Sequence, residues 1–245
     1  MLLIDGYNRM EIAQHFLNES LFDFGNVQTH TREFDKDKYL IIKNFLDADF
    51  VRTHFLPEVV HCEEYMHRVK IGSFKKSGSV GSDQIQKTAP HLFELYHSAW
   101  MKRFVEQVVG EPLCVCPSTD LHSVALYYYT EPGDHIGVHY DKSFYRGRRY
   151  TVLLGLIQDS VESKLVCYPG STKLNRKKNP LNVYTHPGTM IIFNGDSLWH
   201  EVTPLGENEK RVILTMEYVT DPRMSLGNKW VSNLKDRLLY FGKRK

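Results

Sequence analysis

The pattern of apolar and polar residues changes its period once along the chain, near residue 121. Before that point the longest regular pattern is helical. Apolar residues recur at steps of three and four over 90–109, and Gly110 follows as a signal for the end of a helix. We therefore predict one amphipathic helix over 90–109, with its aromatic stripe in the core against the outer face of a sheet.

Other segments of the first half predict shorter helices. Asn8–Asn18 has apolar residues at helical spacing, and Asn8 can cap its start. A second helix is expected over about 48–66, where Asp47 is suited to the N-cap. Pro57 inside that span predicts a break or kink.

The remaining segments before residue 121 predict one strand and two loops. Tyr39–Ile42 is a short apolar run typical of a strand, whereas residues 23–35 have no clear period and are expected to form a loop. Gly72–Gly81 is rich in Gly and Ser between basic residues, which predicts a flexible loop. That loop is either a solvated surface loop or a substrate lid whose basic residues meet an anionic group: Arg68, Lys75 and Lys76.

After residue 121 the pattern is that of strands. Eight short segments rich in β-branched and aromatic residues are separated by turn-forming residues. They are 121–129, 135–141, 149–158, 164–170, 182–186, 188–194, 198–204 and 210–219. Residues 171–180 form a basic loop between two of them, and Asn194–Asp196 is expected to be a hairpin turn. This arrangement predicts an antiparallel barrel or jelly roll.

Length and composition fit one domain with a sizeable core. The chain has 245 residues, of which 42% are hydrophobic and 24% charged. Within a single domain over 1–245, we expect a helical and strand part over 1–120, a β core over 121–220 and a C-terminal part over 221–245. The C-terminal part is expected to contain a capping helix over 222–240 that carries Trp230.

The net charge, the lack of long apolar segments and the cysteine content indicate which partners and which cellular compartment to expect. A net charge of +2, from 31 basic and 29 acidic residues, gives no electrostatic case for nucleic acid. No segment approaches the ~18 apolar residues of a membrane span, and the N-terminus lacks the pattern of a signal peptide. The four cysteines are too few and too irregular for a disulfide framework, so we expect reduced thiols in a cytoplasmic protein.

Two strand-like segments carry candidate metal ligands. His139 and Asp141 are two positions apart, so in an extended strand their side chains point to the same face. A third ligand is available at His200 in another predicted strand. Two His and one carboxylate on one side of a metal leave the opposite positions open, which is the facial arrangement of non-haem Fe(II) oxygenases.

With Arg211, eleven positions after His200, these residues complete a pattern that resembles the Fe(II)/2-oxoglutarate-dependent dioxygenases. The resemblance covers His122–Thr220 and implies a mainly β fold with flanking helices, the double-stranded β-helix (jelly roll, cupin-like). It also implies that Fe(II), 2-oxoglutarate and O2 are used. His139, Asp141 and His200 would then be metal ligands at the catalytic centre, and Arg211 would pair with the far carboxylate of 2-oxoglutarate. Many members have Ser where this chain has Ile213.

Strand alternation adds further candidates. Thr215 and Glu217 share a strand face with Arg211, and a buried Glu needs a partner such as a cationic substrate group. Tyr127, Tyr129 and Thr151 are candidate contacts of 2-oxoglutarate. Trp230 would lie over the pocket, so the expected substrate contacts are Glu217, Thr215 and Trp230. His122, His135 and His186 are expected to be structural residues.

These observations predict a hydroxylase of a small molecule, with a free and possibly basic amino acid as substrate. A weaker resemblance connects the chain to the free-amino-acid hydroxylases and radical halogenases of the superfamily. Radical halogenases have Gly or Ala in place of the carboxylate, so Asp141 favours hydroxylation. The alternative is a peptide or protein hydroxylase of the prolyl-hydroxylase type. The charge argues against a nucleic-acid demethylase, and the intact metal set argues against a non-enzymatic cupin-like module. The oligomeric state stays open.

Overall fold

The computed structural model describes residues 24–224. The helix predicted over Asn8–Asn18 and the residue Trp230 lie outside the described residues, as does almost all of the tail helix predicted over 222–240. Within residues 24–224, no helix is long and apolar enough to span a membrane. All four cysteines are free thiols, as predicted.

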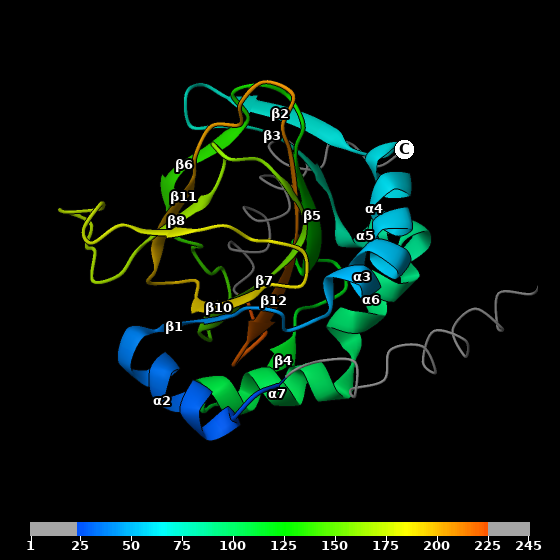
Figure 1. Cartoon of the computed structure of the whole chain (residues 1–245). Coiled ribbons are helices and arrows are strands. Elements are labelled where there is room, and N and C mark those ends of the chain that lie inside the picture. The colour runs from blue at the N-terminus through cyan, green and yellow to red at the C-terminus, as the bar shows by residue number, and fades with distance from the viewer. Residues whose placement is uncertain (1–23, 225–245) are drawn as a thin grey trace, which may run out of the picture.

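The described chain forms one antiparallel sheet that curls into a jelly-roll half-barrel (Figure 1). Every predicted strand segment after residue 121 contains a strand. These are β5 (Val124–Tyr129), β6 (His135–His139), β7 (Arg149–Asp159), β8 (Leu165–Tyr168), β9 (Leu181–Val183), β10 (Met190–Asn194), β11 (Trp199–Val202) and β12 (Lys210–Val219). The predicted strand Tyr39–Ile42 is β1, and the order across the sheet is β1-β10-β7-β12-β5-β3-β6-β11-β8-β9.

The prediction of a loop over Gly72–Gly81 is wrong, because most of this segment is strand β3 (Lys75–Val80). This strand forms a hairpin with β2 (His67–Ile71) and pairs with both β5 and β6, so it joins the two halves of the barrel. Its small residues fit a tightly packed position: a Cβ at Gly78 would lie 1.9 Å from the sulfur of Met66. The Gly and Ser residues that indicated flexibility therefore serve close packing.

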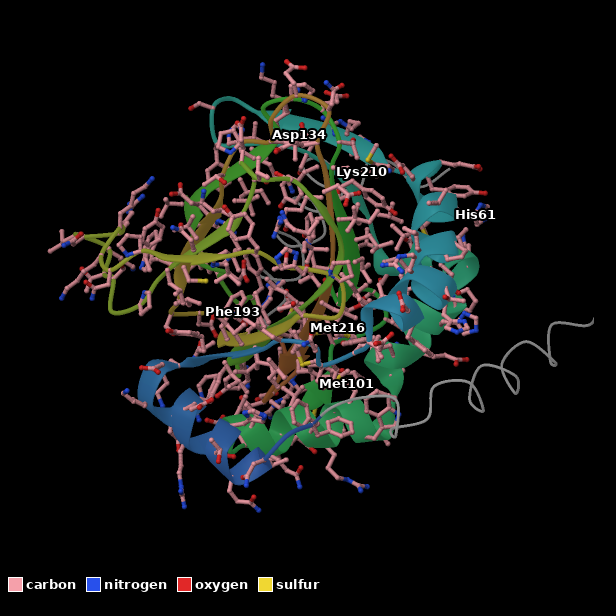
Figure 2. The ribbon with its side chains drawn as sticks, in the orientation of Figure 1. His61, Met101, Asp134, Phe193, Lys210 and Met216 are labelled. Atoms are coloured by element: carbon pink, nitrogen blue, oxygen red, sulfur yellow. The ribbon has the colours of Figure 1, made fainter. Side chains whose placement is uncertain are left out.

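The predicted turn between β5 and β6 is held by the buried carboxylate of Asp134, which Figure 2 places at the top of the barrel. Asp134 accepts hydrogen bonds from the backbone N–H groups of Thr130 (2.9 Å) and Glu131 (3.1 Å). Arg68 donates to both of its oxygens at 2.7 Å. Arg68 thus fixes the start of β6, and Lys76 lies beside Glu131 at 3.1 Å.

Within residues 24–224, four helical segments precede β2, and a helix was predicted for the three that follow Asp47. Asp47 caps α3 (Ala48–Phe50) by accepting from the N–H of Asp49 at 2.8 Å. A π-helical stretch, η2 (Val51–Phe55), then leads into α4 (Leu56–Glu63), with Pro57 in its first turn as the predicted break. The loop predicted over residues 23–35 is wrong, because α2 (Val27–Asp37) occupies it.

The helical layer after β3 consists of α5 (Ser82–Thr88), α6 (Pro90–His97) and α7 (Ala99–Val109). A single helix over 90–109 is therefore wrong, because Ser98 has an extended backbone between α6 and α7 and its hydroxyl caps α7. Gly110 ends α7 with φ of +74°, as the C-cap signal predicted. The short strand β4 (Cys114–Val115) then pairs with the end of β12.

The two largest apolar clusters of the described residues lie on opposite faces of the sheet. One joins the helices to the outer face of the sheet and includes Met101 of α7 and Met216 of β12, and the other lies inside the barrel and includes Phe193 (Figure 2). Residues of β12 alternate between them, so that Leu214 faces the helices while Ile213 faces the barrel interior. This alternation directs the odd-numbered residues of β12 into the barrel.

Candidate active site

His139, Asp141 and His200 meet at the mouth of the barrel. His139 ends β6 and lies directly opposite His200 of β11 in the strand register, with ring centres 4.2 Å apart. Oδ1 of Asp141 lies 3.5 Å from Nε2 of His139 and 3.9 Å from Nε2 of His200. One ligand atom from each residue lies within 4.8 Å of the others, a spacing suited to a single metal ion.

Backbone contacts orient both imidazoles toward that common point. Nδ1 of His139 lies 2.8 Å from the carbonyl oxygen of Gly137, and Nδ1 of His200 lies 3.0 Å from that of Leu198. A carbonyl oxygen can only accept, so each Nδ1 carries the proton and each Nε2 keeps its lone pair for a metal. The donor set therefore fits Fe(II), with a carboxylate and two neutral imidazoles.

The electrostatics of the triad favour metal binding at neutral pH. Burial, and to a smaller extent the neighbouring His139, lower the pKa of His200 to about 4, so the imidazole is neutral at neutral pH. Burial alone would raise the pKa of Asp141, but His200, His139 and Arg149 hold the pKa of this carboxyl well below its usual range. His200 and Asp141 are thus in the protonation states that bind a divalent cation.

Asp141 is held by groups outside the predicted triad. The hydroxyl of Thr151 donates to Oδ2 of Asp141 at 2.9 Å, and the backbone N–H of Asp141 donates to the carbonyl of Gly195 at 2.8 Å. Asp196 accepts from the N–H groups of Ser143 (2.9 Å) and Arg149 (2.8 Å). A turn follows Asn194, but the predicted hairpin is wrong, because the strands that the turn connects, β10 and β11, do not pair with each other. The turn also anchors the loop that carries Asp141.

Arg211 has the surroundings of an anion site. It is 1% exposed on β12, its Cζ lies 5.1 Å from the ring centre of Tyr129, and its Nη2 donates to the hydroxyl of Thr185 at 3.2 Å. Its Nε and Nη1 are buried without a hydrogen-bond partner among the described residues, and burial lowers the pKa of the guanidinium. Leaving such donors unsatisfied costs free energy, so the site fits the far carboxylate of 2-oxoglutarate.

A cavity of about 360 Å³ connects the triad to Arg211. The remaining sequence candidates within the described residues all line it: Tyr127, Tyr129, Thr151, Thr215 and Glu217. Ile213 lines it as well, at the position where the resembled family often has Ser. The shared face predicted for alternate residues of β12 is therefore present.

His122 and Arg149 were not expected to line the cavity, whereas Lys75 was one of three basic residues considered for contact with an anionic group. The other two, Arg68 and Lys76, do not line the cavity. Lys75 is fully buried on β3, with Nζ 4.9 Å from the ring centre of Tyr127. His122 was predicted to be structural, but it lines the cavity, with Nδ1 3.0 Å from the hydroxyl of Tyr127. Arg149 pairs with Glu217, its Nε lying 2.6 Å from Oε2. Only the position of Arg149 had a usable signal, because Arg149 precedes Thr151 by two positions and so shares its strand face.

The other two histidines that were predicted to be structural, His135 and His186, have structural surroundings, in agreement with the prediction. The ring nitrogens of His135 lie 2.8 Å from the carbonyl of Gly133 and 2.9 Å from that of Ser73. The ring of His186 stacks on Tyr184 with centres 6.2 Å apart. Neither lines the cavity.

Comparisons with known proteins agree with this geometry. Residues 123–218 match the model of the 2OG-Fe(II) oxygenase superfamily, and residues 22–146, just over half of the chain, match the family described as Halogenase D. No curated protein matches the sequence.

Solved structures with low sequence identity share the fold. The α-ketoglutarate-dependent non-haem epimerase SnoN from nogalamycin biosynthesis is 15% identical, with a TM-score of 0.65 over 80% of this chain and 82% of its own. A 2OG-Fe(II) oxygenase-family oxidoreductase from Burkholderia pseudomallei is 14% identical, with a TM-score of 0.63 over 84% and 96%. A prolyl-4-hydroxylase from Pseudomonas putida is 15% identical, with a TM-score of 0.58 over 80% and 99%.

Proposed function

The chain belongs to the 2OG-Fe(II) oxygenase superfamily and to the family described as Halogenase D, and within this chemistry we propose that it hydroxylates a small molecule, namely a free amino acid. It is a 2-oxoglutarate-dependent non-haem iron oxygenase that uses Fe(II) and 2-oxoglutarate. The observation that carries the proposal is a small cavity whose wall presents both a buried cation and a carboxylate, Lys75 and Glu217.

The residues of the chain have separate tasks in this chemistry. Bound Fe(II), with 2-oxoglutarate and O2, supplies the oxidation of a C–H bond while 2-oxoglutarate is converted to succinate and CO2. His139, Asp141 and His200 hold the metal, and Arg211 orients 2-oxoglutarate by its far carboxylate. Apolar side chains in the wall, including Ile213, keep water from the reacting centre.

The size of the cavity favours a small substrate. Ligand pockets in proteins are usually ~300–1,000 Å³, and the cavity here is about 360 Å³. It must hold 2-oxoglutarate together with the reacting part of the substrate, which leaves little room for a bulky group. Tyr127, Tyr129 and Thr151 remain candidate contacts of 2-oxoglutarate, although the hydroxyl of Thr151 already binds Asp141.

The charges in the wall suit a zwitterion. Arg211 is assigned to 2-oxoglutarate, so Lys75 is placed to attract the carboxylate of an amino acid. Oε2 of Glu217 contacts Arg149 and Thr151, so Oε1 is the oxygen for a substrate ammonium group. Thr215, two positions before Glu217 on the same face, and Trp230 complete the proposed substrate contacts.

The product is expected to be hydroxylated even when chloride is abundant. In the resembled radical halogenases, Gly or Ala at the position of Asp141 frees a metal position for chloride, whereas Asp141 occupies it here. Mass spectrometry of products made in high chloride should show the addition of oxygen. A dominant chlorinated product would contradict this assignment.

Replacing Glu217 with glutamine should raise KM for the amino-acid substrate strongly, because the ammonium loses a charged acceptor. Turnover of 2-oxoglutarate without substrate should change little, since Arg211 and the metal ligands are unaltered. Steady-state kinetics of Glu217→Gln beside Glu201→Gln, whose carboxylate faces Lys177 outside the cavity, measures the difference. An unchanged KM would remove Glu217 from the substrate site.

A further inference from the structure

One hydroxyl group lies between two carboxylates beside the metal site. Oγ1 of Thr151 is 2.9 Å from Oδ2 of Asp141 and 3.2 Å from Oε2 of Glu217. A threonine hydroxyl has a single proton, so it can donate to only one of the two carboxylates at a time. The contact with Asp141 is the shorter of the two. The Thr151 hydroxyl therefore donates its proton mainly to Asp141, the candidate metal ligand.

Arg149 balances the negative charge of the second carboxylate, that of Glu217. Its Nε donates to Oε2 of Glu217 at 2.6 Å, and the side chain of Glu217 is only 3% exposed. An uncompensated carboxylate at this depth would compete with Asp141 for the Thr151 proton and repel its negative charge. The ion pair satisfies Glu217 and leaves the hydroxyl to Asp141.

The two oxygens of Asp141 consequently face different groups. Oδ1 points toward Nε2 of His139 and of His200, while Oδ2 accepts from Thr151. A carboxylate held in this way offers one oxygen to a metal. Using both oxygens would place the metal and the Thr151 hydrogen bond on the same oxygen, which weakens Oδ2 as a donor to the metal. It would also occupy a position that the facial arrangement leaves open.

The backbone fixes these side chains in register. Thr151 of β7 is directly opposite Glu217 of β12 on one side and Phe193 of β10 on the other, and it is only 1% exposed. Gly195 leaves the necessary space, because a Cβ there would lie 2.9 Å from Oγ1 of Thr151 and 3.2 Å from Cβ of Asp141. Thr151, Glu217 and Arg149 therefore belong to strands of the barrel wall, whereas Asp141 lies in the loop after β6.

We propose that the Thr151 hydroxyl, which the Arg149–Glu217 ion pair leaves available to Asp141, forms a clamp that restricts Asp141 to a single ligand oxygen and thereby sets metal affinity and coordination number. The three are positioning residues that act through Asp141. The proposal rests on the iron site used in the proposed function, but it does not depend on the identity of the substrate.

The first test measures metal binding by the full-length protein without 2-oxoglutarate or substrate, with Co(II) as the probe. Thr151→Val keeps the shape of the side chain and removes the hydroxyl, and should weaken Co(II) binding about 10- to 100-fold, as loss of an outer hydrogen bond to a ligand typically does. The visible absorption of bound Co(II) should change with its coordination. Thr151→Ser restores the hydroxyl and should restore both readouts, while Thr189→Val, a buried threonine outside the cavity wall, should leave them unchanged.

The second test uses the ion pair and does not rely on the Thr151 variants folding. Arg149→Met leaves Glu217 uncompensated and should weaken Co(II) binding, whereas Arg149→Met combined with Glu217→Leu removes the competing carboxylate and should recover it. If Thr151→Val binds Co(II) with the affinity and absorption of the wild type, the proposed clamp is contradicted. A double variant that binds no better than Arg149→Met alone would contradict it as well.

Discussion

His139→Ala is expected to abolish tight Fe(II) binding and, with it, all turnover. The alanine removes one of the two imidazole nitrogens that converge with Oδ1 of Asp141, and two remaining ligands hold a divalent iron poorly. Iron content after anaerobic loading and desalting, together with succinate release, measures both effects.

His135→Ala is the matched control for this variant. His135 lies four positions earlier on the same strand, and its ring contacts backbone carbonyl groups outside the cavity. It should retain iron at the wild-type level. Full iron occupancy in His139→Ala would show that the metal is bound elsewhere.

Arg211→Ala is expected to have the second largest effect, on the affinity for 2-oxoglutarate. Removing one partner of a buried, charge-assisted pair costs ~2–5 kcal/mol. That cost corresponds to a tens-fold or greater loss of affinity. The buried Nε and Nη1 of Arg211 are the donors that would be lost. Titration of 2-oxoglutarate into the anaerobic iron-loaded protein, followed by the charge-transfer absorption of the complex, measures the change.

Lys210→Ala is the control for the arginine variant. Lys210 precedes Arg211 on β12 but points to the other side, where its Nζ pairs with Glu63, and Figure 2 shows it away from the barrel interior. Its removal should leave 2-oxoglutarate affinity unchanged. If Arg211→Ala titrates like the wild type, another residue binds the far carboxylate.

The strands and the metal triad were predictable because their signal is local. Alternating apolar residues define the strands from β5 to β12, and the H-x-D spacing places two ligands on one face. Arg211 and Glu217 were likewise placed on one face by their even spacing. The strand period determines where Arg211 and Glu217 point, whereas Asp141 lies just after β6 and is also held by Thr151 and Gly195.

The missed features depend on contacts between distant segments. The Ser and Gly residues of β3 resemble a loop in isolation, and only the packing of Met66 on Gly78 makes them strand residues. The burial of Lys75 follows from that strand. The pairing of Arg149 with Glu217 depends on the register of β7 with β12, which shifts at a bulge between Val212 and Ile213. The start of α2 depends on a side-chain cap by Asn26 in a helix with a single buried residue, Phe34, so its apolar period is weak.

Substrate-dependent release of succinate tests the central proposal most directly. Purified Fe(II)-loaded protein with 2-oxoglutarate and O2 is incubated with free amino acids and small acids, and both succinate and the candidate product are quantified. We expect a free amino acid, in particular one with a cationic side chain, to stimulate succinate release and to gain one oxygen atom. The amount of hydroxylated product should equal the amount of succinate released. Stimulation by a peptide or an uncharged metabolite alone, with no amino acid hydroxylated, would contradict it.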